Sequence, residues 1–461
     1  MASGKRKYFG TDGVRAVANT GAMTPEFVAQ LGKAASVVLG KKTGAGRPRC
    51  VIGRDTRLSG DMLEAALISG LTTMGVDVEL CGVIPTPAVA LITQQMGASF
   101  GAMVSASHNP FRDNGIKFVN ADGYKLTDEQ ELAIEALVGE MEKGQLPPRA
   151  EPTAIGRVHR VEAPTERYIA HAIATMSGRR LEGWKIALDN ANGAASITSV
   201  ETLRRLGAEV LPFHSSPDGI NINQDCGCTH PEILAELVKQ SGAQVGVAHD
   251  GDADRVALCD ENGVVLLGDE LIAIAAVSML RKGTLRDSTV VVTTMSNFGL
   301  DELVSGLGGK VERTDVGDRY VIAKMRELNT NFGAEESGHI VFRDHATTGD
   351  GLIAALQILK IMAETGEPLS ELRKSLSPFP QVKRNLRVKA KPPIAELTEA
   401  CKLLSETETK LGRLGRVLLR YSGTESLIRL LLEGRDEEYL ETQANKIAAA
   451  IQAQIGETAS A

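Results

Sequence analysis

The sequence predicts an α/β protein with three related α/β domains of mixed, mostly parallel sheets, followed by a C-terminal α+β domain around a central cleft. The main observation is a unit of apolar strand, polar turn, amphipathic helix and second strand. It occurs three times, at residues 50–80, 185–211 and 289–312. A glycine closes each helix, and connections of this length favour parallel strands. The tail from residue 381 lacks the unit.

The elements follow in chain order. The first unit starts at CVIGRD and its helix closes at Gly75, the second starts at KIALDNANGAA and closes at Gly207, and the third starts at TVVVTTMSNFG and closes at Gly308. Each first strand ends in a polar turn, where open α/β sheets bind their ligands. In the tail, we expect strands at 381–389, 415–421 and 427–433 and helices at 394–409 and 436–454.

The chain is too long for one hydrophobic core, since it has 461 residues. Its hydrophobic content of 43% and charged content of 24% are ordinary for globular proteins. Boundaries are expected in the Pro-rich segment 147–152, near residue 260 and at the turn 378–380. The predicted domains are 1–155, 156–259, 260–372 and 373–461.

The net charge of −7 disfavours binding to nucleic acid or acidic membranes, so an anionic substrate must be held by local arginine and lysine clusters. The N-terminus, MASGKRKYFG, lacks the apolar segment of a secretory signal. The longest apolar stretch, 271–280, is too short to span a membrane. We expect a cytoplasmic protein that binds neither nucleic acid nor membrane.

Six scattered cysteines do not make a disulfide framework. Cys226, Cys228 and His230 are close in sequence, but no second pair completes a tetrahedral zinc site. Zinc is therefore not favoured.

The segment DGDADR, residues 250–255, is the clearest chemical signal. Asp250, Asp252 and Asp254 alternate with small residues between two apolar runs, and in an extended tip the alternation points all three carboxylates toward one point. Converging anions favour a hard divalent cation with oxygen ligands. An EF-hand is excluded, because Arg255 stands where that loop needs glycine and the flanks are strands. A solvated acidic turn is the alternative.

A second signal is the loop at Ser107-His108-Asn109-Pro110. A serine beside a histidine suggests a hydrolase, but the G-x-S-x-G turn is lacking, and a tight structural turn is the other alternative. Lys117, near a predicted strand, could supply a proton or a positive charge.

The tail contains RYSGTES. Ser422, Gly423 and Thr424 offer hydroxyls and a close backbone, and Arg420 and Arg429 add charge, which together suit a phosphate. A purely structural turn is the alternative.

Taken together, VSASHNP, DGDADR, the EESGH of 335–339 and the RYSGTES of 420–426 resemble the α-D-phosphohexomutase superfamily in order and spacing. YFGTDGVRA (8–16) and VGDRY (316–320) are most similar to its bacterial phosphoglucosamine mutase branch. The resemblance covers essentially the whole chain.

The resemblance implies an isomerase, an intramolecular phosphotransferase that interconverts glucosamine 6-phosphate and glucosamine 1-phosphate. Ser107 is then carried as a phosphoserine, and a hexosamine 1,6-bisphosphate is the primer or intermediate. One Mg²⁺ per chain is bound by the phosphate on Ser107 and by the three aspartates of the DGDADR loop. Lys117 is the expected general acid/base, and Arg15 binds the phosphoryl group.

Recognition of the phosphorylated hexose or hexosamine is implied at two places. Glu335 and Ser337 suit sugar hydroxyls, with a cap as the alternative, and Arg255 and Arg319 complete the expected substrate site. The RYSGTES turn holds the phosphate that is not transferred. His339 is either a second proton carrier or a structural histidine, and the protein is expected to be a monomer or a homodimer.

The chain departs from the family pattern at Ala16, His249 and Ser426, none of which is a reacting group. A phosphoglucomutase/phosphomannomutase of the same fold is the alternative function. A catalytically inactive sugar-phosphate sensor is disfavoured by the intact Ser107, Lys117 and three aspartates.

Overall fold

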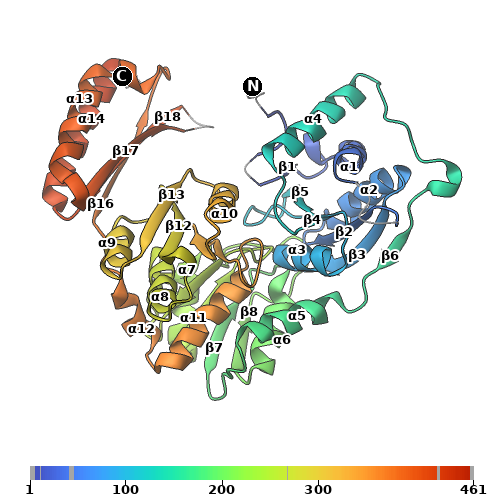
Figure 1. Ribbon diagram of the computed structural model, residues 1–461, viewed down its shortest axis with the longest axis horizontal. Coiled ribbons are helices and arrows are strands. Elements are labelled where there is room, and N and C mark those ends of the chain that lie inside the picture. The colour runs from blue at the N-terminus through green and yellow to red at the C-terminus, as the bar shows by residue number, and fades with distance from the viewer. Residues whose placement is uncertain (1–5, 11, 41–45, 267, 423–425, 457–461) are drawn as a thin grey trace. The chain divides into compact units, whose positions relative to one another are not determined.

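The computed structural model describes residues 6–10, 12–40, 46–266, 268–422 and 426–456. They form two compact units, each with its own sheet structure. The larger unit contains the residues up to Met295 together with Leu307–Ser375, and the smaller contains Ser296–Gly306 and the residues from Leu376 onward. Figure 1 labels most of the elements of both.

The first sheet of the larger unit has the strand order β1-β5-β4-β2-β3-β6. Strand β2 is parallel to β3 and β4, and β3 to β6, while β5 is antiparallel to β1 and β4. Helices α1, α2 and α4 share a hydrophobic core with the sheet, and α3 contacts β2 and β4 (Figure 1). The bounds are β1 Val14–Val17, α1 Pro25–Leu39, β2 Arg49–Arg54, α2 Gly60–Thr73, β3 Asp77–Val83, α3 Thr86–Gln95, β4 Phe100–Val104, β5 Asp113–Asn120, α4 Asp128–Glu142 and β6 Val158–Arg160.

The second sheet has the order β11-β10-β9-β7-β8. Strand β7 is parallel to β8 and β9, and β10 is antiparallel to β9 and β11. Helix α7 packs on β7, β9 and β10, and α6 contacts β8 and α5. The bounds are α5 Pro164–Thr175, β7 Lys185–Asp189, α6 Ala195–Arg205, β8 Glu209–Phe213, α7 Pro231–Ser241, β9 Val245–His249, β10 Val256–Cys259 and β11 Val265–Leu266.

The third sheet has the order β13-β12-β14-β15, with β12 parallel to β13 and β14, and β15 antiparallel to β14. Helix α10 packs on β12, β13 and β14, and α11 contacts β15 and also β9 and β10 of the second sheet. The bounds are α8 Gly268–Arg281, β12 Thr289–Thr293, β13 Lys310–Thr314, α10 Asp318–Glu327, β14 Phe332–Ala334, β15 Ile340–Phe342, α11 Gly351–Thr365 and α12 Leu369–Leu372.

The three sheets share one connectivity. In each sheet, the strand that begins the repeated unit (β2, β7 or β12) pairs in parallel with the next strand on one side (β3, β8 or β13). On its other side it pairs in parallel with the strand after that (β4, β9 or β14), which is followed by an antiparallel strand (β5, β10 or β15). The hairpins β4–β5, β9–β10 and β14–β15 are therefore equivalent connections. Their loops contain Ser107, the DGDADR segment and the EESGH segment. All three motifs therefore lie at the same position of the shared connectivity, in the loop of the antiparallel hairpin.

The strand–helix–strand units have the local features that the sequence predicts. Gly75, Gly207 and Gly308 have φ of 81°, 98° and 78°, the left-handed values expected just past a helix. Thr127 starts α4 with a capping box: it accepts from the N–H of Gln130, whose side chain accepts from the N–H of Thr127.

The smaller unit is an antiparallel sheet of order β16-β18-β17 that packs with α13 and α14 around its own apolar core. Glu433 is fully buried in β18 and accepts from Arg416 Nε at 2.7 Å and from the N–H of Phe298 at 2.9 Å. The bounds are α9 Gly299–Gly306, β16 Gln381–Arg387, α13 Thr398–Leu411, β17 Gly415–Tyr421, β18 Leu427–Gly434 and α14 Glu437–Ile455.

The predicted fold class is confirmed: mixed, mostly parallel sheets of one connectivity are followed by an α+β tail. The tail helix expected from residue 394 begins only at Thr398, because a 3-10 turn, Ile394–Glu396, follows Pro393 and interrupts it. None of the described helices has the length and apolarity needed to cross a membrane.

Candidate active site

Two of the three equivalent hairpin loops, the acidic loop and the EESGH loop, line one cavity of the larger unit, with a volume of about 200 Å³. Its lining combines the acidic loop, the EESGH loop and residues from the edge of the first sheet. The lining residues are Asp12, Lys125, Asp254, Arg255, Val316, Gly317, Asp318, Glu335, Glu336, Ser337 and His339. This cavity brings together the acidic loop and the EESGH loop, while the Ser107 loop is not part of its lining.

The acidic loop brings its carboxylates together. Oxygens of Asp250, Asp252 and Asp254 lie within 4.8 Å of one another, and all three side chains are buried. The backbone is not the extended tip that the alternation suggested, because Ala253 has φ of 56° and turns the chain. The three carboxylates converge because the chain turns between β9 and β10.

Gly251 lets this loop pack against Ser107. A Cβ at this position would lie 2.7 Å from the carbonyl oxygen of Ser107 and 2.8 Å from Asn223 Nδ2. The N–H of Ala194 donates to the Gly251 carbonyl at 2.8 Å, which fixes the loop from the other side. Glycine is therefore required at this position of DGDADR, because the acidic loop approaches the Ser107 main chain closely.

The charges of the loop favour a cation. Burial, Asp254 and Asp252 raise the pKa of Asp250 well above its usual range. Asp252 Oδ1 and Asp254 Oδ1 are buried and have no hydrogen-bond partner within the described part of the chain. Buried anionic oxygens require a partner, and a cluster of carboxylate oxygens suits a hard divalent ion. These residues fit a metal site.

Ser107 lies against this cluster. Its Oγ donates to Asp250 Oδ2 at 2.5 Å, and its side chain is buried. The neighbouring His108 has a buried Nδ1 without a hydrogen-bond partner in the described residues, and burial, Arg255 and Arg15 lower the pKa of His108 to about 4. Ser107 thus contacts the candidate metal site directly.

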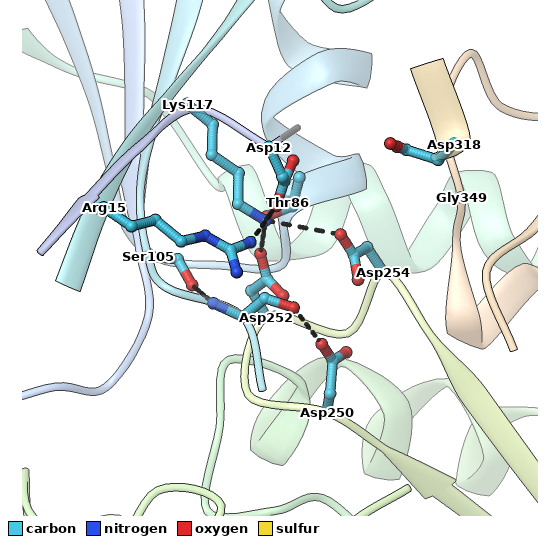
Figure 2. A network of polar contacts seen from close by, with 12 residues as sticks. Asp12, Arg15, Thr86, Ser105, Lys117, Asp250, Asp252, Asp254, Asp318 and Gly349 are labelled. Atoms are coloured by element: carbon cyan, nitrogen blue, oxygen red, sulfur yellow. Dashed lines mark hydrogen bonds and ion pairs between the residues drawn. The ribbon is translucent and has the colours of Figure 1, made fainter. Parts of the chain in front are cut away.

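Lys117 reaches the same place from β5. Its Nζ lies 2.7 Å from both Asp12 Oδ2 and Asp252 Oδ2 and 3.5 Å from Asp254 Oδ2. Burial opposes its charge, but Asp12, Asp252 and Asp254 raise the pKa of Lys117 above its ordinary value. Figure 2 shows Lys117 and Arg15 directed toward the carboxylates, where Arg15 pairs with Asp12. Lys117 is therefore a fixed cation.

Four residues around this cluster, Asp12, Thr86, Lys125 and Asp318, were not among the predicted site residues. Asp12 lies between Lys117 and Lys125, whose Nζ is 2.5 Å from Asp12 Oδ1 and 2.5 Å from Asp318 Oδ2. The Oγ1 of Thr86 donates to Asp252 Oδ2 at 2.5 Å. Asp12 lies within the FGTDGVR motif and could have been found there, whereas Thr86 has no such signal.

The EESGH loop lines the cavity. Glu335 is buried, accepts from the N–H of Gly317 at 3.0 Å, and burial raises its pKa. Ser337 is exposed. Arg255 Nε lies 4.0 Å from Asp254 Oδ1. The N–H of Gly349 donates to His339 Nε2 at 3.0 Å, which makes that nitrogen an acceptor.

Arg319 occupies a different environment from the other predicted substrate residues. Its Nη1 lies 2.9 Å from Glu131 Oε2 and 3.1 Å from Asp128 Oδ1, and its side chain is buried. The guanidinium joins α10 to α4. Its predicted contact with substrate stays a prediction.

In the smaller unit, the predicted phosphate residues lie at the β17–β18 hairpin. Arg420 and Arg429 face each other in register on adjacent antiparallel strands. Ser422 is buried, while Gly423 and Thr424 lie outside the described residues.

Two further sequence expectations have structural outcomes. His249, a departure from the family pattern, is fully buried, which lowers its pKa to about 4, and its Nε2 lies 3.1 Å from Ser199 Oγ. Two of the residues considered above for a zinc site, Cys226 and His230, have different neighbours. Cys226 lies near Asp189 and His214, whereas His230 Nδ1 is 3.2 Å from Glu232 Oε1.

Comparison with known proteins matches the geometry. Sequence profiles of the phosphoglucomutase/phosphomannomutase α/β/α domains I, II and III match residues 6–145, 166–263 and 267–379, and that of the C-terminal domain matches 384–450. The fold is similar to that of a phosphoglucomutase/phosphomannomutase family protein from Burkholderia thailandensis, with a TM-score of 0.78 and 22% identity over 97% of this chain and 99% of that one.

Fold, acidic loop and serine loop together define a phosphohexomutase, and the chain belongs to the phosphoglucomutase/phosphomannomutase family of isomerases. Within it, the similarity is to proteins named phosphoglucosamine mutase. One from Geobacter sp. (strain M21) is 48% identical over 452 residues, 98% of this chain and 99% of the relative. One from Caulobacter vibrioides is 47% identical over 97% of this chain and 99% of the relative.

Proposed function

We propose that this protein interconverts glucosamine 6-phosphate and glucosamine 1-phosphate, with a phosphorylated Ser107 as phosphoryl donor and acceptor. The observation that carries the proposal is the position of Ser107 Oγ, 2.5 Å from Asp250 in a buried cluster of three carboxylates. A serine hydroxyl beside candidate metal ligands is suited to phosphoryl transfer.

Four oxygens would hold one Mg²⁺: one from each of Asp250, Asp252 and Asp254, and one from the phosphate on Ser107. When bound there, the ion would neutralise charge that builds on the transferring phosphoryl group. Asp252 Oδ1 and Asp254 Oδ1 support these assignments, because both are buried without a hydrogen-bond partner in the described residues.

Lys117 supplies fixed charge and a proton at the reacting oxygen. In the forward half-reaction the Ser107 Oγ–P bond breaks, a sugar O–P bond forms, and one proton passes from the sugar hydroxyl to Ser107 Oγ. Lys117, whose Nζ lies 2.7 Å from Asp252 Oδ2, would relay this proton: its ammonium protonates the departing Ser107 oxygen, and the resulting amine accepts the proton of the sugar hydroxyl. Arg15 would bind the phosphoryl oxygens.

The product of this half-reaction is a 1,6-bisphosphate, which must turn before its other phosphate returns to Ser107. Glu335, Ser337 and Arg255 line the cavity and suit sugar hydroxyls and phosphate. Arg420, Ser422, Gly423, Thr424 and Arg429 would hold the phosphate that is not reacting. Arg420 and Arg429 are register partners on β17 and β18, which brings two basic residues to the same hairpin.

The preference for glucosamine is supported by the full-length relatives named phosphoglucosamine mutase. An N-acetylphosphoglucosamine mutase from Aspergillus fumigatus was solved with GlcNAc-6P and magnesium; it has a TM-score of 0.65 and 18% identity over 97% of this chain and 96% of that one. A cytoplasmic location is part of the proposal, supported by six free cysteines.

Replacing Ser107 by alanine tests the proposal. We expect loss of turnover with the fold intact, because a loop hydroxyl contributes little to packing. Intact-mass measurement of the active protein should show one phosphate, located on the peptide that contains Ser107. Ser241→Ala, in α7, is the control, because that hydroxyl bonds a carbonyl of its own helix.

Two results would contradict the proposal. One is full activity of a phosphate-free preparation without added bisphosphate. The other is a rate on glucose or mannose 6-phosphate that exceeds the rate on glucosamine 6-phosphate, which would favour the phosphoglucomutase/phosphomannomutase alternative.

A further inference from the structure

The backbone of Ser107 has a conformation that a serine rarely adopts. Its φ is 54°, in the left-handed region, where residues other than glycine are found mainly when the surrounding structure holds them. Ser107 Oγ reaches Asp250 from this conformation. The direction of the reacting oxygen therefore depends on what fixes the main chain of the β4–β5 loop.

Arg57 binds that main chain from the side of the first sheet. Its Nη2 donates to the carbonyl oxygens of Ser107 at 2.9 Å and Asn109 at 2.8 Å. Its Nη1 donates to those of Pro110 at 2.5 Å and Asp113 at 3.0 Å. One guanidinium thus joins both ends of the loop.

Asp55 holds the guanidinium in place. Its Oδ2 accepts from Arg57 Nε at 2.9 Å, and both side chains are fully buried. The same oxygen accepts from Ser105 Oγ at 2.6 Å, and Ser105 Oγ in turn accepts from the N–H of Ser107 at 2.9 Å. The ion pair and the loop therefore form one continuous network.

Asn223, in the segment between β8 and α7, also binds the loop. Its Nδ2 donates to the carbonyl oxygens of Ser107 at 2.8 Å and Asn109 at 3.0 Å, the two that also accept from Arg57. Its own N–H donates to Ala191 at 2.9 Å, which fixes its position.

We infer that Arg57 and Asn223 are positioning residues that clamp the Ser107 loop through the same two carbonyl oxygens and direct Ser107 Oγ toward the metal site. This inference rests on the proposed function of Ser107. Arg57 is 1% and Asn223 8% exposed, so they act through the loop and not on substrate.

The clamp requires the planar fork of arginine. A lysine can keep the charge beside Asp55, but its single ammonium cannot reach four carbonyls in two directions. Because a small displacement of a reacting group slows chemistry without weakening remote substrate contacts, the expected effect falls on kcat and not on KM.

The first test is Arg57→Lys. We expect kcat to fall by roughly 10- to 100-fold while KM for the sugar phosphate stays within about two-fold. Arg49→Lys is the matched control, because Arg49 also donates to a backbone carbonyl, that of Met96, from the other end of β2. The control should keep the wild-type kcat.

The second test is Asn223→Asp, which is nearly isosteric but replaces the donor by an acceptor facing two carbonyls. It should give the same fall in kcat at unchanged KM, and it decides the question if Arg57→Lys does not fold. A folded variant of either kind with wild-type kcat, or with a raised KM alone, would overturn the inference.

The inference and the proposed function fail differently. If Ser107→Ala keeps its activity, the proposed function is wrong, and the inference about Arg57 and Asn223 is wrong with it. If Ser107→Ala is inactive while Arg57→Lys and Asn223→Asp turn over normally, only the clamp is wrong.

Discussion

Replacing Asp350 by asparagine is expected to make the stability of the larger unit less dependent on pH. Asp350 caps α11: its Oδ1 accepts from the N–H of Ile353 at 2.9 Å and from the hydroxyl of Tyr168 at 2.8 Å. Burial raises its pKa from the ordinary 3.8 to about 6, although these bonds and the nearby His171 oppose the rise. The next residue, Gly351, donates its N–H to Ala253 in the acidic loop at 3.0 Å.

The sign follows from proton linkage. Between pH values near 4 and 6 the folded state holds the proton on Asp350 while the unfolded state has released it, so folding stability falls as pH rises through this window. At about 1.4 kcal/mol per pKa unit, the shift costs about 3 kcal/mol above the window, and roughly half of that develops from about pH 5 to about pH 8.

Asparagine keeps the cap oxygen and cannot ionise, so this dependence should disappear. Urea unfolding at both pH values, followed by the fluorescence of Trp184, the sole tryptophan, measures the free energy of unfolding of the larger unit. The variant should gain about 1–2 kcal/mol relative to wild type on going from about pH 5 to about pH 8. The control is Asp218→Asn in the larger unit, where the exposed Asp218 side chain accepts from the N–H of Ile220. An equal difference between Asp350→Asn and wild type at both pH values would refute the reasoning.

Three further outcomes are expected. Asp252→Asn should weaken Mg²⁺ binding and slow phosphoryl transfer more than it raises KM, because its Oδ1 is a buried candidate ligand; full activity of the wild type in excess chelator would contradict this. Lys117→Met should lower kcat by roughly 10²- to 10⁴-fold in steady-state assays, since it removes the cation beside Asp12 and Asp252, and an unchanged kcat would exclude it as the proton carrier. Arg429→Ala should raise KM in both directions by roughly 10- to 100-fold through loss of a charge-assisted contact, and unchanged KM values would make the RYSGTES turn structural.

Local periodicity explains how much of the fold could be predicted from the sequence. The strand–helix–strand units are specified by apolar alternation, a polar turn and a closing glycine, all within about 30 residues. The pairs β2–β3, β7–β8 and β12–β13 are accordingly parallel as predicted. The polar turns after these strands also pointed to the correct edge of each sheet.

Contacts between distant segments could not be predicted in this way. Thr86 bonds Asp252 across 166 positions, and Arg319 bonds Glu131 across 188, so neither pairing leaves a local pattern. Tertiary packing decides such partners. The sequence likewise contained Arg57 as part of a polar turn, but only the folded loop shows that its guanidinium binds four carbonyls.

The equivalence of the β4–β5, β9–β10 and β14–β15 connections has a consequence for how such an enzyme can diversify. Each task in the proposed reaction is assigned to one hairpin, and each hairpin is anchored in a sheet of its own. A change at Glu335 or Ser337 alters the contacts available to the sugar, whereas Gly338 in the same connection is tied to the acidic hairpin, because its carbonyl accepts from the N–H of Val256 at 3.1 Å. Selection can therefore change which hexose is accepted while the chemistry of phosphoryl transfer is inherited unaltered.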